Sequence, residues 1–119
     1  MKRILMVAIL VFAGSTVYSQ IYVGDININK KHGIEYVELV GITKNFKTIV
    51  HVDYGQAKPK AEEIRDKDGK IARSGNIISA LNLMTRNGWE FVNSYGYGSN
   101  DESIVRYLLK KADPNKKRK

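Results

Sequence analysis

The sequence predicts an α+β fold, with an antiparallel sheet of about four strands and one helix packed on one face. Four segments (34–43, 47–54, 89–97 and 103–110) are rich in β-branched and aromatic residues or alternate apolar with polar side chains. One segment between the second and third strands repeats apolar residues at helical spacing. Short turns join the strands within each pair, which favours antiparallel neighbours. The expected order is strand, strand, loop or small hairpin, helix, strand, strand.

The first strand pair is preceded by a less regular segment. Residues 21–29 alternate apolar with polar side chains but are rich in Asn, so they predict a weak strand at best. Residues 30–33 form the turn that follows. Strand 34–43 then turns through 44–46 into strand 47–54, which predicts an antiparallel hairpin.

The stretch between the second strand and the helix contains two breaks. Pro59 interrupts the sheet, because proline has no N–H to donate. The pair Asp68-Gly69 is a turn signal, since both residues tolerate positive φ. A small exposed hairpin or loop is expected here.

The helix begins at a cap supplied by Ser74 or Asn76 and ends at Asn87-Gly88, where glycine suits the left-handed position after a helix. Its apolar side chains cover most of its circumference and leave one narrow polar stripe. A single sheet covers only one side of such a helix. We therefore expect Ile78 or Leu83 to remain available to a protein partner or to a second copy of the chain.

The second strand pair carries most of the aromatic residues. In a regular strand Trp89, Phe91, Tyr95 and Tyr97 share one face, and the Trp89 and Phe91 rings are expected to pack against the helix. On the last strand, the side chains divide between two faces: Ile104 and Leu108 on one, and Val105, Tyr107 and Leu109 on the other.

The junction of helix and strand resembles a known family. The pattern consists of Leu81-Asn82 on the helix, the corner Gly88-Trp89-Glu90, and a closing strand with Tyr-Leu-Leu-Lys-Lys at 107–111. It resembles a family of short bacterial proteins classed as a domain of unknown function, and an exported Gram-negative subgroup with an Asp-Gly-Lys loop. The resemblance covers residues 74–111, and strands 34–54 more loosely.

The resemblance implies the fold and no catalytic residues. It marks a structural motif that comprises Leu81, Asn82, Gly88, Trp89 and Phe91. Residues 21–33 depart from the family pattern, and we interpret them as an addition.

The N-terminus predicts export. Lys2 and Arg3 precede an apolar run, Ile4 to Ala13, of about ten residues, whereas a membrane-spanning helix needs roughly twenty. Val17 and Ser19 occupy the −3 and −1 positions of a cleavage site before Gln20. We expect a signal peptide at 1–19, a single domain at 20–112 and a disordered basic tail at 113–119. The mature protein is expected in the periplasm or secreted, with no membrane anchor.

The charge of the chain is concentrated at its ends. The formal net charge is +8, but residues 20–109 carry twelve basic and eleven acidic side chains. A nearly neutral body argues against nucleic acid as a partner. The chain has no cysteine, which excludes disulfides, thiolate metal sites and a cysteine nucleophile.

The sequence assigns no catalytic, metal or cofactor residue. His51 and Asp53 share one face of strand 47–54, but a zinc site normally needs a third ligand, and nothing places His32 beside them. Acidic residues that could act in pairs lie in segments expected to be loops or exposed strands: Glu62, Glu63, Glu90, Asp101 and Glu102. No serine lies in a nucleophile motif.

Three function classes stay open. The first is a non-enzymatic domain that acts by binding or by assembly into a homo-oligomer or with a protein partner. The second is a ligand-binding module, in which Tyr95 and Tyr97 with nearby Arg106 stack on sugar rings or bases, or the basic tail binds an anionic polymer. Ordinary sheet packing explains the same aromatic residues. The third class, a small hydrolase, has no supporting motif.

Overall fold

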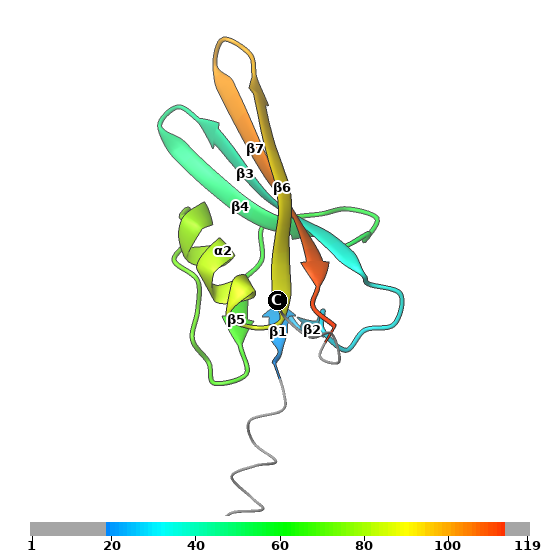
Figure 1. Ribbon diagram of the computed structural model, residues 1–119. Helices are drawn as coiled ribbons and strands as arrows, with labels where there is room; N and C mark the ends of the chain where they lie inside the picture. The colour runs from blue at the N-terminus through cyan, green and yellow to red at the C-terminus, as the bar shows by residue number, and fades with distance from the viewer. Residues whose placement is uncertain (1–18, 114–119) are drawn as a thin grey trace, which may run out of the picture.

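The computed structural model of the protein describes residues 19–113, and Figure 1 shows its arrangement. The predicted signal peptide, apart from Ser19, and the predicted basic tail after Asp113 lie outside the described residues. The described residues form the strands and the helix β1 (Ile21–Val23), β2 (Ile26–Asn27), β3 (Tyr36–Lys44), β4 (Lys47–Asp53), β5 (Ile64–Asp66), α2 (Ile77–Thr85), β6 (Trp89–Gly98) and β7 (Glu102–Lys111).

Four long strands form the larger sheet, in the order β4-β3-β7-β6. All of its pairs are antiparallel, and β3 pairs with β7 along its whole length, from Tyr36 opposite Lys110 to Lys44 opposite Glu102. This register places the β3–β4 and β6–β7 turns at the same end of the molecule (Figure 1). The predicted α+β class and the antiparallel pairing of these strands are therefore confirmed.

The β3–β4 turn consists of two residues with positive φ, Asn45 at 53° and Phe46 at 63°. A two-residue hairpin of type I′ requires this conformation at both positions, because its twist matches that of the flanking strands. Asn tolerates it, whereas a bulky residue such as Phe is strained there. The Phe46 ring is fully exposed at the tip of the hairpin.

Helix α2 packs on one face of the larger sheet (Figure 1). Asn76 rather than Ser74 caps it, because the Asn76 Oδ1 atom accepts a hydrogen bond of 3.0 Å from the Ser79 N–H. The helix lies close to β3 because Gly41 has no side chain: a Cβ atom there would come within 2.9 Å of the Ile77 Cδ1 atom.

The expectation of one sheet is incomplete, because a second sheet has the order β2-β1-β5. Gly24 has a φ of 58° and bends residues 21–29 into the β1–β2 hairpin in place of one weak strand. β5 then pairs with the other side of β1, with Ile21 opposite Asp66. The predicted turn at Asp68-Gly69 follows β5, where the Asp66 carboxylate accepts the N–H groups of Asp68 and Lys70.

Residues 21–33 contribute to the core and are not a peripheral addition. Ile21, Val23 and Ile28 are fully buried in the same cluster as Trp89 and Met84. The cluster lies between the larger sheet, the helix and the smaller sheet. The status of residues 21–33 as an addition relative to the family pattern stays a prediction, but in this chain they are an integral part of the core.

The smaller sheet also changes what the helix exposes. Leu83 is only 2% exposed and belongs to the core, whereas Ile78 is 50% exposed. Of the two alternatives, Ile78 or Leu83, the structure leaves only Ile78 exposed, because Leu83 packs in the core cluster together with residues of the smaller sheet. Ile78 is therefore the one helix residue, of the two expected to contact a partner, that is exposed.

A β-bulge divides β6 into two parts. Phe91 pairs with Leu109 and Asn93 with Leu108, so Val92 is an extra residue. The bulge reverses the orientation of the side chains that follow it. Phe91 is in register with Leu109 on the core-facing side, whereas Tyr95 pairs with Arg106 and Tyr97 with Ile104 on the opposite side. The prediction that all four aromatic residues share one face is therefore wrong.

Candidate binding site on the outer face of the sheet

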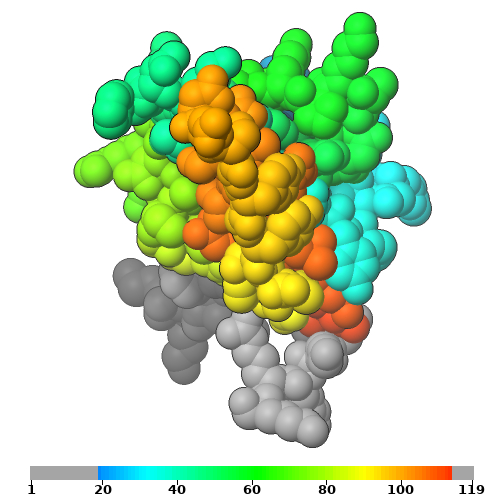
Figure 2. Space-filling view, turned by 90° about the horizontal axis from the view of Figure 1, so that it is seen from above, coloured from blue at the N-terminus to red at the C-terminus, as the bar shows by residue number. Residues whose placement is uncertain are grey.

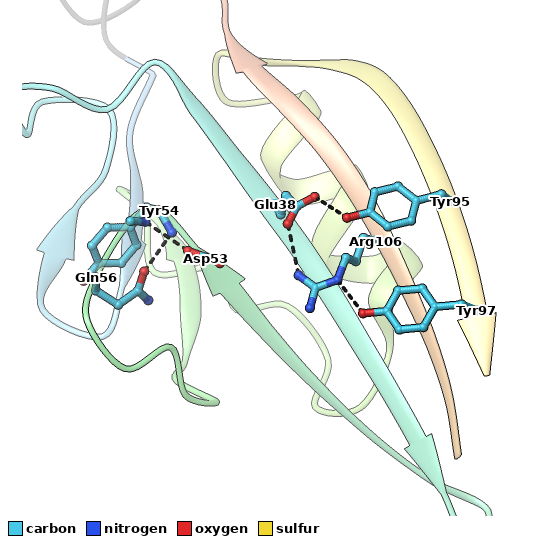
Figure 3. A network of polar contacts seen from close by, with 8 residues as sticks. Glu38, Asp53, Tyr54, Gln56, Tyr95, Tyr97 and Arg106 are labelled. Atoms are coloured by element: carbon cyan, nitrogen blue, oxygen red, sulfur yellow. Dashed lines mark hydrogen bonds and ion pairs between the residues drawn. The ribbon is translucent and has the colours of Figure 1, made fainter. Parts of the chain in front are cut away.

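The outer face of the larger sheet, on the side opposite α2, is the candidate site. The register aligns four residues across it, one from each strand: His51, Val40, Arg106 and Tyr95. Val40 is fully buried although it lies on this face, so the neighbouring side chains cover it. Figure 3 shows the polar side chains of this face in front of the sheet, with the helix behind it.

Tyr95 and Tyr97 form an aromatic platform on this face. Their ring centroids are 6.2 Å apart and their planes differ by 16°. In Figure 3 the two rings lie side by side, with their faces directed away from the sheet. Each tyrosine is 49% exposed. Two adjacent and nearly parallel rings therefore present a flat apolar surface to solvent.

Arg106 and Glu38 hold the two tyrosine hydroxyls in place. The Tyr95 hydroxyl donates to Glu38 Oε2 at 3.0 Å, and the Arg106 Nε–H donates to the Tyr97 hydroxyl at 3.1 Å. Arg106 Nη1 and Glu38 Oε1 form an ion pair of 3.0 Å between them. Both of these charged side chains are about a quarter exposed. The network therefore runs continuously from one ring to the other across three strands (Figure 3).

The charges of the network shift the pKa values of its members. The hydrogen bond to Glu38 raises the pKa of the Tyr95 phenol, because ionisation would remove the donated proton. The hydrogen bond to Tyr97, followed by the contact with Glu38, raises the pKa of Arg106. Both shifts favour the protonated forms that the hydrogen bonds require.

His51 lies at the other end of the same row. Burial lowers the pKa of its imidazole from 6.5, and the positive charge of Arg106 lowers it further, while Asp53 opposes the shift. Asp53 is opposite Glu38 in register and accepts a hydrogen bond from the Gly55 N–H at 3.0 Å. A neutral imidazole and one carboxylate therefore border the network on the β4 side.

The structure places the predicted structural motif at the corner between α2 and β6. Gly88 has a φ of 88°, Trp89 is fully buried and Leu81 is half-buried against the core, whereas the Asn82 side chain is exposed. Phe91 is 51% exposed and its ring contacts Tyr107 with a centroid separation of 6.1 Å. The prediction that the Phe91 ring is buried against the helix is therefore wrong, since β6 is an edge strand there.

The residues considered for metal binding or catalysis are divided among several parts of the described structure. His32 lies exposed in the turn before β3, and within residues 19–113 no three His, Asp or Glu side chains form a group able to hold a metal ion. Glu38 joins His51 and Asp53 on the outer face, but a cavity of about 520 Å³ lies elsewhere, between β4 and residues 61–75. The Glu62 and Glu63 carboxylates lie together before β5 and line this cavity, whereas Glu90, Asp101 and Glu102 lie at the ends of β6 and β7, away from it.

Sequence reasoning identified Tyr95, Tyr97 and Arg106 but missed Glu38. The available signal was a charged residue flanked by Val37 and Leu39 inside a strand. Its role depends on the register of β3 with β7, which brings residues 38 and 106 together across a sequence separation of 68 residues. The bulge at Val92 was also missed. Its local signal is Asn93, whose side chain accepts the Ser94 N–H at 2.8 Å and competes with the strand ladder.

Comparisons of this chain with protein-family models, with curated proteins and with solved structures find no match. The resemblance to the bacterial family therefore stays a prediction from the motif residues. In the part of the chain that the structure describes, no helix has the length and apolar character needed to cross a membrane.

Proposed function

We propose that this protein is a non-enzymatic binding domain that holds neutral sugar rings on the Tyr95–Tyr97 platform. The observation that carries the proposal is the pair of half-exposed, nearly parallel rings on the outer face of the sheet. The electron-rich face of an aromatic ring attracts the C–H groups on the face of a sugar, and sugar hydroxyls accept and donate hydrogen bonds at its rim. Arg106 and Glu38 lie where such bonds would form.

The hydrogen-bond network supports this role because it fixes the rings before a ligand arrives. Free exposed tyrosines lose rotamer freedom when they bind, which costs about 0.5–1.5 kcal/mol for each immobilised side chain. Here the Tyr95 and Tyr97 hydroxyls are already bonded to Glu38 and Arg106. A ligand that stacks on the platform therefore avoids much of that cost.

The charges of the outer face favour a neutral ligand over a polyanion. Nucleic acids and acidic polymers bind through cations that are free to contact phosphate or carboxylate groups. Arg106 is paired with Glu38, and Asp53 lies opposite Glu38 on the neighbouring strand. The proposed export of the protein would also expose this surface to the polysaccharides outside the cell membrane.

The direct test is binding of neutral hexasaccharides of glucose and of N-acetylglucosamine, followed by NMR. We expect the chemical shifts of Tyr95, Tyr97 and Arg106 to change. The double variant Tyr95→Ala/Tyr97→Ala should bind at least about tenfold more weakly, by analogy with nucleobases, for which each stacked aromatic ring contributes roughly 1–3 kcal/mol. Tyr36→Ala is the matched control, because Tyr36 is equally exposed and lies on the same face of β3 without joining the network.

Other outcomes separate the alternatives. No binding of any neutral sugar, or equal loss in the Tyr36→Ala control, would contradict the proposal. Salt-sensitive binding of a single-stranded oligonucleotide or an acidic polysaccharide that disappears on deletion of residues 113–119 would favour the basic tail as the binding element instead.

A further inference from the structure

The free edge of the larger sheet is exposed along β6. In the described structure β6 pairs only with β7, and every residue of β6 after Trp89 is exposed. Figure 2 shows the β6–β7 hairpin, in yellow to orange, on the surface with no other coloured segment over it. The opposite edge differs, since Gly75 approaches the Thr48 carbonyl so closely that a Cβ atom there would be 3.0 Å away. Of the two edges, β6 is the one that is open.

The second half of β6, residues 93–98, lacks the features that usually prevent pairing at an edge. Natural edge strands carry lysine, proline or inward-pointing charges. Within residues 93–98 there is no charged residue and no proline, and the sequence is Asn-Ser-Tyr-Gly-Tyr-Gly. The bulge at Val92 lies before this segment, which pairs regularly with β7 from Asn93 to Gly98. A second strand can therefore align with it.

The hydrogen-bond pattern shows which backbone groups point outward. The Ser99 N–H donates to the Glu102 carbonyl, so residues 99 and 102 form a bonded pair. Because bonded and non-bonded pairs alternate in an antiparallel ladder, residues 93, 95 and 97 direct their backbone groups to β7. Ser94, Gly96 and Gly98 direct theirs to the free edge, and their small side chains do not obstruct an approaching strand.

We propose that β6 pairs antiparallel with β6 of a second copy of this chain, about a two-fold axis at Gly96. Each Gly96 then donates to and accepts from Gly96 of the other copy, and each Gly98 N–H donates to the Ser94 carbonyl opposite. In the same pair the Ser94 N–H donates to the Gly98 carbonyl of the other copy, so on pairing it exchanges its bond to the Asn93 side chain for this one. The two four-stranded sheets become one continuous sheet.

The same axis explains why a second copy fits this edge. Tyr95 lies directly opposite Tyr97 of the second copy in a non-bonded pair, where Cα atoms approach to about 4.5 Å. Aromatic pairs of this kind stabilise sheets by roughly 0.2–1 kcal/mol each. No like charges meet within residues 93–98. The two platforms join into a surface of four tyrosine rings, so the partner extends the site proposed above.

The test is sedimentation velocity of the full chain between about 5 and 500 µM, since an edge contact is small beside the roughly 1,200 Å² of a stable interface and a weak dimer is expected. The variant Gly96→Pro removes the central outward N–H without breaking a bond to β7 and should sediment as a monomer. Gly96→Ala is the matched control, because its N–H remains and the added Cβ meets only the Ile104 carbonyl at 3.4 Å.

Hydrogen exchange of the parent chain provides a second measurement that does not depend on the variant folding. The Gly96 and Gly98 amides should become protected as the concentration rises, while the Ser99 amide is protected throughout. Concentration-independent exchange at both glycines, or a folded Gly96→Pro chain that dimerises like the parent, would overturn the proposal. The two proposals can fail separately. A parent chain that dimerises but binds no sugar would contradict only the proposed function, whereas a parent chain that binds sugar but stays monomeric would contradict only this inference. Gly96→Pro retains both tyrosines, so it also shows whether a monomer can bind sugar.

Discussion

His51 is the titratable residue of the outer face whose environment most directly predicts a measurable effect. Its imidazole is partly buried beside the Arg106 guanidinium, and both effects disfavour the charged form. Asp53 on the same strand partly opposes them, and Glu38 lies opposite Asp53 on the neighbouring strand. Protonation of His51 therefore costs more in the folded protein than in the unfolded chain.

This difference predicts how stability depends on pH. The unfolded chain takes up a proton near the ordinary pKa of 6.5, before the folded protein does. The free energy of unfolding should therefore fall as the pH decreases through 6.5 towards the lowered pKa, and should be insensitive to His51 at higher pH. Urea unfolding followed by the fluorescence of Trp89 between about pH 8 and pH 5 measures it.

His51→Gln should remove this part of the pH dependence. His32→Gln, in the exposed turn before β3, is the matched control and should leave the profile unchanged. Profiles of the His51→Gln variant and the parent that superimpose would show that His51 makes no contribution.

The β1–β2 hairpin is held in the molecule by Asn29, two residues after the end of β2. The Asn29 Oδ1 atom accepts the Ile21 N–H at 2.9 Å and the Trp89 indole N–H at 3.0 Å. The Asn29 Nδ2 group donates to the Asn87 carbonyl at 3.0 Å. One amide side chain therefore joins the N-terminal hairpin, the end of α2 and the largest buried ring.

Replacement of Asn29 by Ala should lower the free energy of unfolding by about 1–3 kcal/mol, because the buried indole N–H loses its acceptor. Chemical unfolding measures this loss. Asn82→Ala is the matched control: that side chain is exposed on α2, and alanine has the better helix propensity, so stability should be unchanged or slightly raised. Equal stability of the Asn29→Ala variant and the parent would contradict the role given to Asn29.

At the scale of elements, the sequence predicts what depends on local periodicity. The helix, a cap at Ser74 or Asn76 and the four long strands follow from residue spacing and turn residues, and the structure selects Asn76. The second sheet depends on the pairing of β1 with β5, which lie about forty residues apart, and short strands of three residues carry little periodic signal. The orientation of Tyr95 and Tyr97 depends on one bulge residue, which alternation alone does not reveal.

For the whole molecule, the N-terminal hairpin completes the core. Ile21, Val23 and Ile28 are fully buried, and burial of each such side chain contributes about 1.5–3 kcal/mol. Together these contributions are comparable with the roughly 5–15 kcal/mol that holds a small domain folded. Without these three side chains, the larger sheet and the helix would expose Trp89, Leu83 and Met84.

A chain that begins at Lys30 should therefore lose its cooperative thermal transition and its near-UV circular dichroism. Deletion of residues 114–119 is the control and should leave both signals unchanged, because it retains every residue of the core cluster between Ile21 and Leu109. A cooperative transition in the chain that begins at Lys30 would show that the larger sheet and the helix are stable without the hairpin.

The corner at Gly88 has a consequence for how the protein can be tethered. Ser19 and Asn29 lie against Gly88, and the Ala112 N–H donates to the Gly88 carbonyl at 2.8 Å. The first and last described segments therefore leave the domain from one point, while the β3–β4 and β6–β7 turns lie at the far end (Figure 1). Immobilisation on a solid support through a side chain placed at residue 19 or 112 should therefore leave the tyrosine platform and the β6 edge accessible to the surrounding solution.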